Sequence, residues 1–562
     1  MTTFTKDTLS AISLSVVTVG HTGCNVVVDG TNDTSQIQSA INTIHALGGG
    51  NIVFTPMTFI ITTPILLYSD VRLYGSGRDI TILYLKTGSN CNVINTGLQS
   101  NVGVYDLTID GNGTNQTGGT GINTSDFLTV GAGTTTNIQI QNVKLTDIYS
   151  TAITTVGDQI TIDNVFIDTV LTDVGIGGNT ATKVKVLNSI ITGTYGSAFQ
   201  VCGDGATNSF NYDVVYDNCL AYSCGTAASP ASGFDMTQVK RGICNNCIAY
   251  LNYGAGVNIE YNAEKITFNN CICDQNIFGG HAGGGNFNLG GVIKKEIVLN
   301  NCIIINGESV GSFKSGLFIG QGGGGSAQDV VLNNILIRDN TGDGLYQQHA
   351  ITMIGGEIAN PAYKGIAQTA GQCNGTIIDG VTFTGITEGS SQCIQISSDD
   401  VRITNCNFKT CSGQFGILAD QYNYLQINNN QFNNVNTPLR VTRSIGSQMD
   451  GNSFHNCDYN TIGLAGDTFC SVSNNTIINC ANQANDVSAN IFIESYSATH
   501  SLRNRVNGNT IYTSTANKPK FGIREDTSDQ NYNVYLGNVA TNAATTNIST
   551  QGAQSDASHN IN

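Results

Sequence analysis

The sequence contains no tryptophan and only 6 prolines among 562 residues, and charged residues make up 11% of it. No stretch approaches the roughly 18 consecutive apolar residues that a membrane-spanning helix needs. Lysine and arginine together number 24 against 40 acidic residues, for a net charge of −16, and no basic cluster interleaved with aromatics occurs. We therefore expect neither membrane insertion nor nucleic-acid binding.

The chain is rich in glycine, with 66 residues, and in a short pattern that recurs along most of its length. The pattern is Asn or Gly, then a small or apolar residue, then an apolar residue two positions further on. Its first residues are Asn142, Asn164, Asn188, Asn218, Asn246, Asn270, Asn301, Asn334, Gly355, Gly380, Asn405, Asn429, Gly451, Asn474, Gly508 and Gly537, with Asp106 as an opening member. Spacings of 21 to 36 residues indicate a solenoid in which each repeat is one turn of the chain.

Stacked turns place like residues on like, at about 4.8 Å per turn. An Asn at a bend adopts the left-handed conformation, and we expect its amide to bond the next Asn and to satisfy buried polar groups. A second unit, Gly-apolar-x-apolar, recurs nine or ten residues later, for example in SGFDM (232–236) and AGVNI (255–259). Two strands and two bends per repeat predict an all-β, three-faced parallel β-helix of about 16 or 17 coils over residues 51–540.

Residues 34–47 differ from this pattern. Ile37, Ala40, Ile41 and Ile44 lie on one face of a helix, and glycines follow at 48–50. Because the first coil of a solenoid lacks a partner, this helix is predicted to cap it. The predicted organisation is an N-terminal segment (1–24) for attachment or assembly, the β-helix with its cap (25–540), and a polar C-terminal tail (541–562).

Residues 26–82, together with LTIDGNG (107–113), are similar to the opening of the pectate-lyase-like right-handed parallel β-helix superfamily. Within it the chain most resembles phage tail spikes and other surface β-helix proteins. The resemblance implies a right-handed coil, but the superfamily includes lyases, hydrolases, epimerases and binders. The paired-Asp and Gly-His-Gly motifs of polygalacturonases are not found, so no catalytic residue is carried over.

The 17 cysteines are an odd number, and several keep register with the repeat. Cys219, Cys247, Cys271 and Cys302 each follow the corner Asn, which predicts a buried, reduced column rather than disulfides. No metal site is expected at Cys244-x-x-Cys247, and no cofactor is expected, with bound Ca²⁺ as an open alternative. No signal peptide is recognisable near the start of the sequence.

Positions two and four after the glycine of the second unit are predicted to face solvent on one face of the coil. Asp235 and Glu260 lie there on successive repeats, about 8 Å apart from strand spacing, which is the separation of an inverting glycosidase pair. They are the candidate catalytic residues. The candidate substrate-binding residues are Asn258, Phe318, Tyr346 and Gln348 on the same stripe, with His281 in a Gly-rich insertion.

The leading hypothesis is a virion or extracellular-surface protein resembling a phage tail spike, which binds a surface polysaccharide as a homotrimer and meets other virion tail proteins. One alternative is an enzyme that degrades polysaccharides, either a lyase or a glycoside hydrolase. A second alternative is a structural fibre or coat component.

Overall fold

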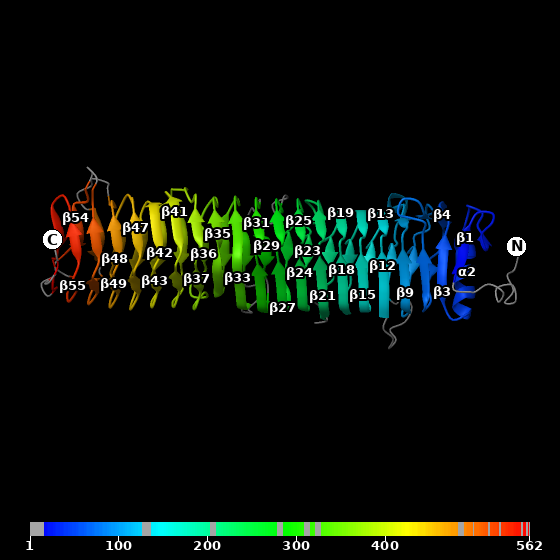
Figure 1. The fold of residues 1–562 in the computed structure, drawn as a ribbon, viewed down its shortest axis with the longest axis horizontal. Helices are drawn as coiled ribbons and strands as arrows, with labels where there is room; N and C mark the ends of the chain where they lie inside the picture. Colours follow the sequence, from blue (N-terminus) through cyan, green and yellow to red (C-terminus); the bar gives the residue numbers. More distant parts are fainter. Residues whose placement is uncertain are drawn as a thin grey trace. The chain divides into compact units, whose positions relative to one another are not determined.

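The computed structural model describes residues 16–125, 136–202, 210–277, 285–290, 292–307, 315–320, 327–389, 391–481, 488–497, 499–514, 518–527, 530–551, 555–557 and 560. Contacts divide the chain into unit 1, Met1–His281, and unit 2, Ala282–Asn562. Each unit is a right-handed parallel β-helix with three faces, which we call faces 1, 2 and 3 (Figure 1). Within the described residues, no helix is long and apolar enough to cross a membrane.

In unit 1 each coil contributes a strand to face 1, then face 2, then face 3. Face 1 contains β1 (Val16–Gly20) with its short partner β2 (Val26–Val27), β3 (Gly50–Phe54), β6 (Val71–Tyr74), β9 (Ser100–Tyr105), β12 (Thr136–Gln141), β15 (Gly157–Asp163), β18 (Ala181–Leu187), β21 (Asn211–Asp217), β24 (Val239–Asn245) and β27 (Tyr261–Asn269). Face 2 contains β4 (Thr58–Ile61), β7 (Ile82–Leu85), β10 (Thr108–Asp110), β13 (Lys144–Ile148), β16 (Phe166–Val170), β19 (Ile190–Thr194), β22 (Leu220–Tyr222), β25 (Ile248–Tyr250) and β28 (Ile272–Asp274). Face 3 contains β5 (Ile65–Leu66), β8 (Ile94–Asn95), β11 (Ile122–Asn123), β14 (Ile153–Thr154), β17 (Ile176–Gly177), β20 (Phe199–Gln200), β23 (Phe234–Asp235) and β26 (Val257–Asn258), and a 3-10 turn, η1 (Gly113–Asn115), precedes β11.

Unit 2 repeats this order, with β33 (Ala327–Arg338) and β35 (Ile351–Ala359) running through both face 1 and face 2. The rest of face 1 is β30 (Val292–Asn300), β37 (Ile377–Asp379), β40 (Arg402–Thr404), β43 (Gln426–Asn428), β46 (Gln448–Asp450), β49 (Ser471–Ser473), β52 (Arg505–Asn507) and β55 (Val534–Leu536). The rest of face 2 is β31 (Ile303–Ile305), β38 (Thr382–Thr384), β41 (Asn407–Cys411), β44 (Gln431–Val435), β47 (Ser453–His455), β50 (Thr476–Ile478), β53 (Thr510–Tyr512) and β56 (Val539–Thr541). Face 3 is β29 (Gly285–Leu289), β32 (Ser315–Ile319), β34 (Asp343–Gln347), β36 (Ile366–Gln368), β39 (Gln392–Ile396), β42 (Phe415–Asp420), β45 (Leu439–Thr442), β48 (Ile462–Ala465), β51 (Ala489–Glu494), β54 (Phe521–Glu525) and β57 (Thr546–Ser549).

The described face 3 strands number eight in unit 1 and eleven in unit 2, more than the 16 or 17 coils predicted. The two coils beyond 17 lie near the start of the chain. Near the start, β5 and β8 belong to coils without the Asn corner. Near the end, β57 lies within the segment 541–562 and pairs with β54, so part of the polar tail continues the coil.

The predicted cap helix is present as α2 (Thr34–Ala46), which buries Ile37, Ala40, Ile41 and Ile44. Asp33 precedes it, but its carboxylate does not cap the helix. Instead, that carboxylate accepts hydrogen bonds from the backbone N–H groups of Gly30 and Ile60, at 2.8 Å each. The buried Asp33 therefore ties the cap to the first coils of unit 1.

The corner asparagines have the expected left-handed conformation, with φ of 54° at Asn270 and 55° at Asn474. Both side chains are exposed because the left-handed bend turns them outward, so they do not satisfy the buried polar groups as expected. The buried column lies one residue later along the chain in unit 2. It consists of Asn430, Asn452, Asn475, Asn509 and Asn538, all at most 1% exposed.

Each buried asparagine holds the coil on either side of it. The side-chain amide of Asn475 donates to Met449 O and to Asn509 Oδ1, and its Oδ1 accepts from the backbone N–H and the side-chain amide of Asn452. Two of these bonds satisfy backbone groups that the corner leaves without strand partners, and the other two link the amides of successive coils.

All 17 cysteines are free thiols, and only Cys24 and Cys91 are partly exposed. Cys219, Cys247 and Cys271 in unit 1, and Cys302 in unit 2, are at most 2% exposed, as predicted. Burial raises the pKa of the Cys244 and Cys247 thiols, which further suppresses the reactive thiolate.

We expect a thiol-alkylating reagent to modify two cysteines rapidly in the folded protein, Cys24 and Cys91, and the other fifteen only on unfolding. Mass spectrometry of peptides after timed iodoacetamide labelling measures this, with guanidinium-unfolded protein as the control. Rapid native labelling of Cys247 or Cys271 would contradict the buried column.

Candidate functional site

The candidate acidic residues lie on face 3 of unit 1. A glycine precedes each strand because the coils approach closely: a Cβ on Gly233 would lie 2.7 Å from Gly256 O. The next residue, Phe234 on β23 or Val257 on β26, points into the core. The residue after that, Asp235 or Asn258, therefore points outward, and these two are register partners.

Asp235 is held by two neighbours, Thr237 and Asn258. Its Oδ1 accepts from the backbone N–H of Thr237 at 2.9 Å, and the Asn258 amide lies 3.5 Å from its Oδ2. The Thr237 hydroxyl accepts from the backbone N–H of Glu260 at 3.1 Å. Glu260 is exposed and close enough to influence the charge of Asp235. The structure thus brings Asp235, Asn258 and Glu260 together.

Asp235 and Asn258 were expected to face solvent, but they are only 8% and 7% exposed. Burial raises the pKa of Asp235 to about 6, and the Glu260 carboxylate adds to the increase, while the hydrogen bonds from Thr237 oppose it. An acid with this pKa next to an exposed carboxylate can hold a proton near neutral pH and deliver it to a leaving group.

The pKa of Asp235 predicts a pH dependence of stability. Its folded-state value of about 6 exceeds the ordinary 3.8, so the folded state binds the proton more tightly than the unfolded state. The stabilisation is complete below about pH 4 and is lost as the pH rises through 6, a change of about 3 kcal/mol in the free energy of unfolding. Urea denaturation of the parent and of Asp235→Asn at pH 4, 5 and 7 measures it. A constant difference between the two proteins across this range would contradict the raised pKa.

The predicted aromatic residues lie on face 3 of unit 2. Phe318 on β32 stacks on its register partner Tyr346 on β34, with ring centroids 5.8 Å apart and planes inclined by 19°. The Tyr346 hydroxyl lies 3.1 Å from Thr369 Oγ1. Gln348 is half-buried just beyond β34. Phe318 is only 8% exposed because its ring lies over Gly320, which has no side chain to displace it.

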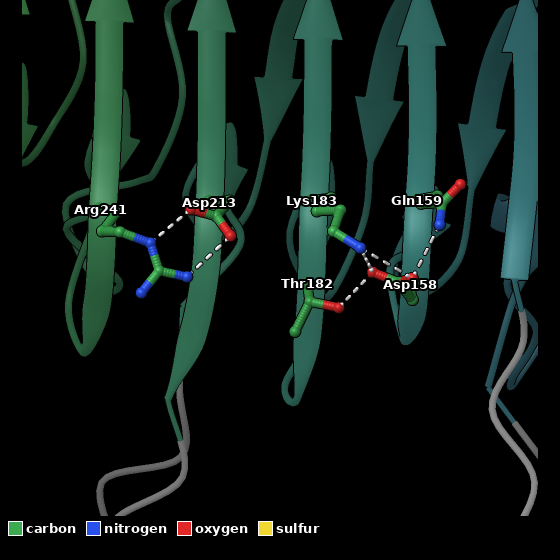
Figure 2. Close-up of polar contacts among 6 residues, drawn as sticks. All are labelled: Asp158, Gln159, Thr182, Lys183, Asp213 and Arg241. Atoms are coloured by element: carbon green, nitrogen blue, oxygen red, sulfur yellow. Dashed lines mark hydrogen bonds and ion pairs between the residues drawn. The ribbon is translucent and has the colours of Figure 1, made fainter.

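The predicted residues therefore form two clusters, an acidic and amide one in unit 1 and an aromatic one in unit 2. His281 lies outside the described residues. The nearby basic residues of unit 1 are directed elsewhere: on face 1, Arg241 forms a bidentate pair with Asp213 at 2.6 and 2.8 Å, and Lys183 pairs with Asp158 (Figure 2).

Sequence reasoning missed a charged group further along face 3 of unit 2. Arg440 on β45 reaches over Gly463 on β48 to Glu494 on β51, with Nη2 2.5 Å from Oε1. Arg443 pairs with Asp420 at 2.6 Å and lies 4.4 Å from the ring centre of Tyr496. The coils of Arg440 and Glu494 lack the Gly-apolar-x-apolar unit, so only a coil-by-coil register alignment could have found these two residues.

Among the described residues, no group of three or more His, Cys, Asp or Glu side chains is placed to hold a metal ion. Whether Ca²⁺ binds stays a prediction.

No protein-family model matches the chain, and no curated protein sequence matches it. It is similar to solved structures at low identity. The A-module of mannuronan C-5 epimerase AlgE4 of Azotobacter vinelandii is 14% identical, with 94% of this chain and 97% of that chain covered and a TM-score of 0.24. A tailspike protein of E. coli bacteriophage HK620 is 12% identical, with 77% of each chain covered and a TM-score of 0.40. A polygalacturonase of Erwinia carotovora is 12% identical, with 71% and 94% covered and a TM-score of 0.35.

Proposed function

We propose that the protein binds an extended polysaccharide on face 3, with one site in each unit, as a receptor-binding component of a virion or of another extracellular surface. The observation that carries the proposal is a set of outward hydrogen-bonding side chains on face 3 of unit 1. Asp235 and Asn258 are buried register partners, and the exposed Glu260 is tied to Thr237 through its backbone N–H. Buried carboxylate and amide groups suit sugar hydroxyls, and the stacked Phe318 and Tyr346 suit sugar ring faces.

The test is binding of the full chain to a panel of bacterial surface polysaccharides, compared with Glu260→Gln and Tyr346→Ala. We expect each substitution to weaken binding about tenfold, because each removes one hydrogen-bonding or stacking group. The matched control is Glu264→Gln, which changes an acid on face 1 that pairs with Lys240. Unchanged binding by both face 3 variants would overturn the proposal.

A second candidate function is cleavage of the bound polysaccharide. It is favoured by the raised pKa of Asp235 beside Glu260, since glycoside hydrolysis uses one protonated and one ionised carboxyl group. Release of reducing ends from the same panel separates binding from cleavage. If the chain neither binds nor cleaves any of these polysaccharides, a structural fibre or coat role is the better reading.

We further propose that the protein assembles as a homotrimer, with residues 1–24 serving attachment to other virion tail proteins. Support for assembly comes from an outward apolar column on face 2 of unit 1. Its members are register partners on five successive coils, namely Phe166, Ile190, Leu220, Ile248 and Ile272. Ile190 and Ile248 are 41% and 39% exposed, so the column leaves apolar area to bury.

Light scattering of the parent should give three times the monomer mass, and Ile190→Glu with Ile248→Glu should give the monomer. Ile354→Glu, an equally exposed isoleucine on β35 of unit 2, is the control and should leave the mass unchanged. A monomeric parent at micromolar concentration would contradict the assembly.

A further inference from the structure

One corner of unit 2, just before face 1, carries large side chains in a left-handed backbone. In successive coils the backbone N–H of the corner residue donates to a carbonyl of the next coil, which aligns the corner residues in one column. We call this column the ridge, and its members are Tyr424, Gly446, Phe469, Arg503 and Tyr532. Their φ angles are 57°, 70°, 58°, 59° and 61°.

Bulky residues are disfavoured in this conformation, which suits Gly and Asn. The neighbouring corner of the same coils follows that rule, with Asn429, Gly451, Asn474, Gly508 and Gly537. Three aromatic residues have a positive φ among the described residues, and all three lie on the ridge. Other long side chains, such as Arg241 and Leu251, also adopt this backbone, but the aromatic residues that do so are confined to the ridge, which points to a function of these rings.

Folding does not account for these aromatics. Tyr424, Phe469 and Tyr532 are 58%, 56% and 51% exposed, so they bury little apolar area. Their arrangement is nevertheless ordered: the Arg503 guanidinium lies between two rings, 5.5 Å from the centre of Phe469 and 5.7 Å from that of Tyr532. The Tyr424 ring lies over Gly446, with Cδ1 3.1 Å from where a Cβ would be.

A second column of hydrogen-bonding side chains runs parallel to the ridge. Each of its members follows a ridge residue by two positions in the sequence. Gln426, Gln448, Ser471 and Arg505 are outward register partners on face 1. Among the described residues, neither Arg503 nor Arg505 forms an ion pair. Two arginines on an acidic chain of net charge −16 therefore make a local positive site.

We propose that the ridge binds an acidic polysaccharide, with sugar rings packing on Phe469 and Tyr532 and sugar carboxylates pairing with Arg503 and Arg505. The two rings are two coils, or about 9.6 Å, apart, which suits an extended disaccharide. Guanidinium groups pair with carboxylates in two-pronged geometry, and aromatic rings pack against the C–H faces of sugars. The ridge lies outside face 3, so this site goes beyond the proposed function and adds the chemical class of the ligand.

The test titrates the full chain with polygalacturonate, alginate, hyaluronate and polysialate, and with neutral dextran as the uncharged comparison. The variant Phe469→Asn/Tyr532→Asn removes the rings but keeps a residue that suits the left-handed backbone. We expect the parent to bind at least one acidic polymer and not dextran, the aromatic variant to bind about tenfold more weakly, and Arg503→Asn to lower the salt dependence. Tyr363→Asn changes an aromatic of unit 2 that is also 51% exposed but lies off the ridge, and should have no effect.

The melting temperature of Phe469→Asn/Tyr532→Asn should equal or exceed that of the parent, because the strain is relieved. A clear fall would mean that the aromatics serve folding, and would overturn the proposal. The proposal would also be overturned if dextran bound as tightly as the acidic polymers, or if no acidic polymer bound. A changed oligomeric mass in the variant would overturn it as well, and so would competition by single-stranded oligodeoxythymidine. Binding that Phe469→Asn/Tyr532→Asn weakens belongs to the ridge, and binding that Glu260→Gln or Tyr346→Ala weakens belongs to face 3, so failure of the face 3 proposal is distinguishable from failure of the ridge.

Discussion

Replacing Asn475 by leucine should lower the free energy of unfolding by about 3 kcal/mol or more. The substitution leaves Met449 O and the backbone N–H of Asn452 buried without partners, and each orphaned group costs about 1–3 kcal/mol. Leucine has the same side-chain branching as asparagine with bulkier methyl groups, so the substitution leaves no cavity and the main loss is of hydrogen bonding. Urea denaturation followed by circular dichroism measures it.

The adjacent residue provides the control. Asn474→Gly keeps the left-handed corner, since Gly451 and Gly508 occupy it on the neighbouring coils, and removes only an exposed bond to Asp450. We expect a change of about 0.5 kcal/mol or less. If Asn474→Gly destabilises as much as Asn475→Leu, then the exposed column and not the buried one holds the coils together.

This pair of residues also shows where sequence reasoning works and where it stops. The repeat of Asn and Gly correctly predicts the positive φ at the corner, because few other residues adopt that backbone. It does not reveal which way the side chain points. Burial depends on how the bend joins two faces. Asn270, a corner residue expected to satisfy buried polar groups, is exposed, while Asn475, one residue after the corner Asn474, belongs to the interior column.

At the candidate site, too, some features could be predicted from the sequence and others could not. The Gly-apolar-x-apolar unit correctly places Asp235 and Asn258 on one face and in register, because alternation along a strand is a local property. Their burial, and with it the pKa of Asp235, depends on chain segments distant in sequence and could not be predicted locally. The bridge from Arg440 to Glu494 was missed for a related reason, since it spans two coils over a glycine.

If the chain cleaves its polysaccharide, Asp235→Asn and Glu260→Gln should each reduce kcat by about a thousandfold or more, a far larger effect than the roughly tenfold loss of binding expected for Glu260→Gln. Asp235 is the group with the raised pKa and so would protonate the leaving oxygen. Glu260, diagonal to it at about 8 Å from the strand spacing, would act on the opposite side of the sugar through a water.

The pH profile assigns the roles. Because the acid must be protonated, kcat/KM should fall as the pH rises through about 6, the pKa of Asp235. The residual activity of Glu260→Gln should still fall as the pH rises through about 6, whereas that of Asp235→Asn should no longer show this fall. Cleavage that persists in both variants, with this fall unchanged, would place the chemistry elsewhere, and the pair of Asp420 and Glu494 on face 3 of unit 2 would be the next acids to replace. Inversion of the anomeric configuration in the product, followed by NMR, is the expected outcome of so wide a separation, because a nucleophilic mechanism needs the two carboxyl groups about 5 Å apart.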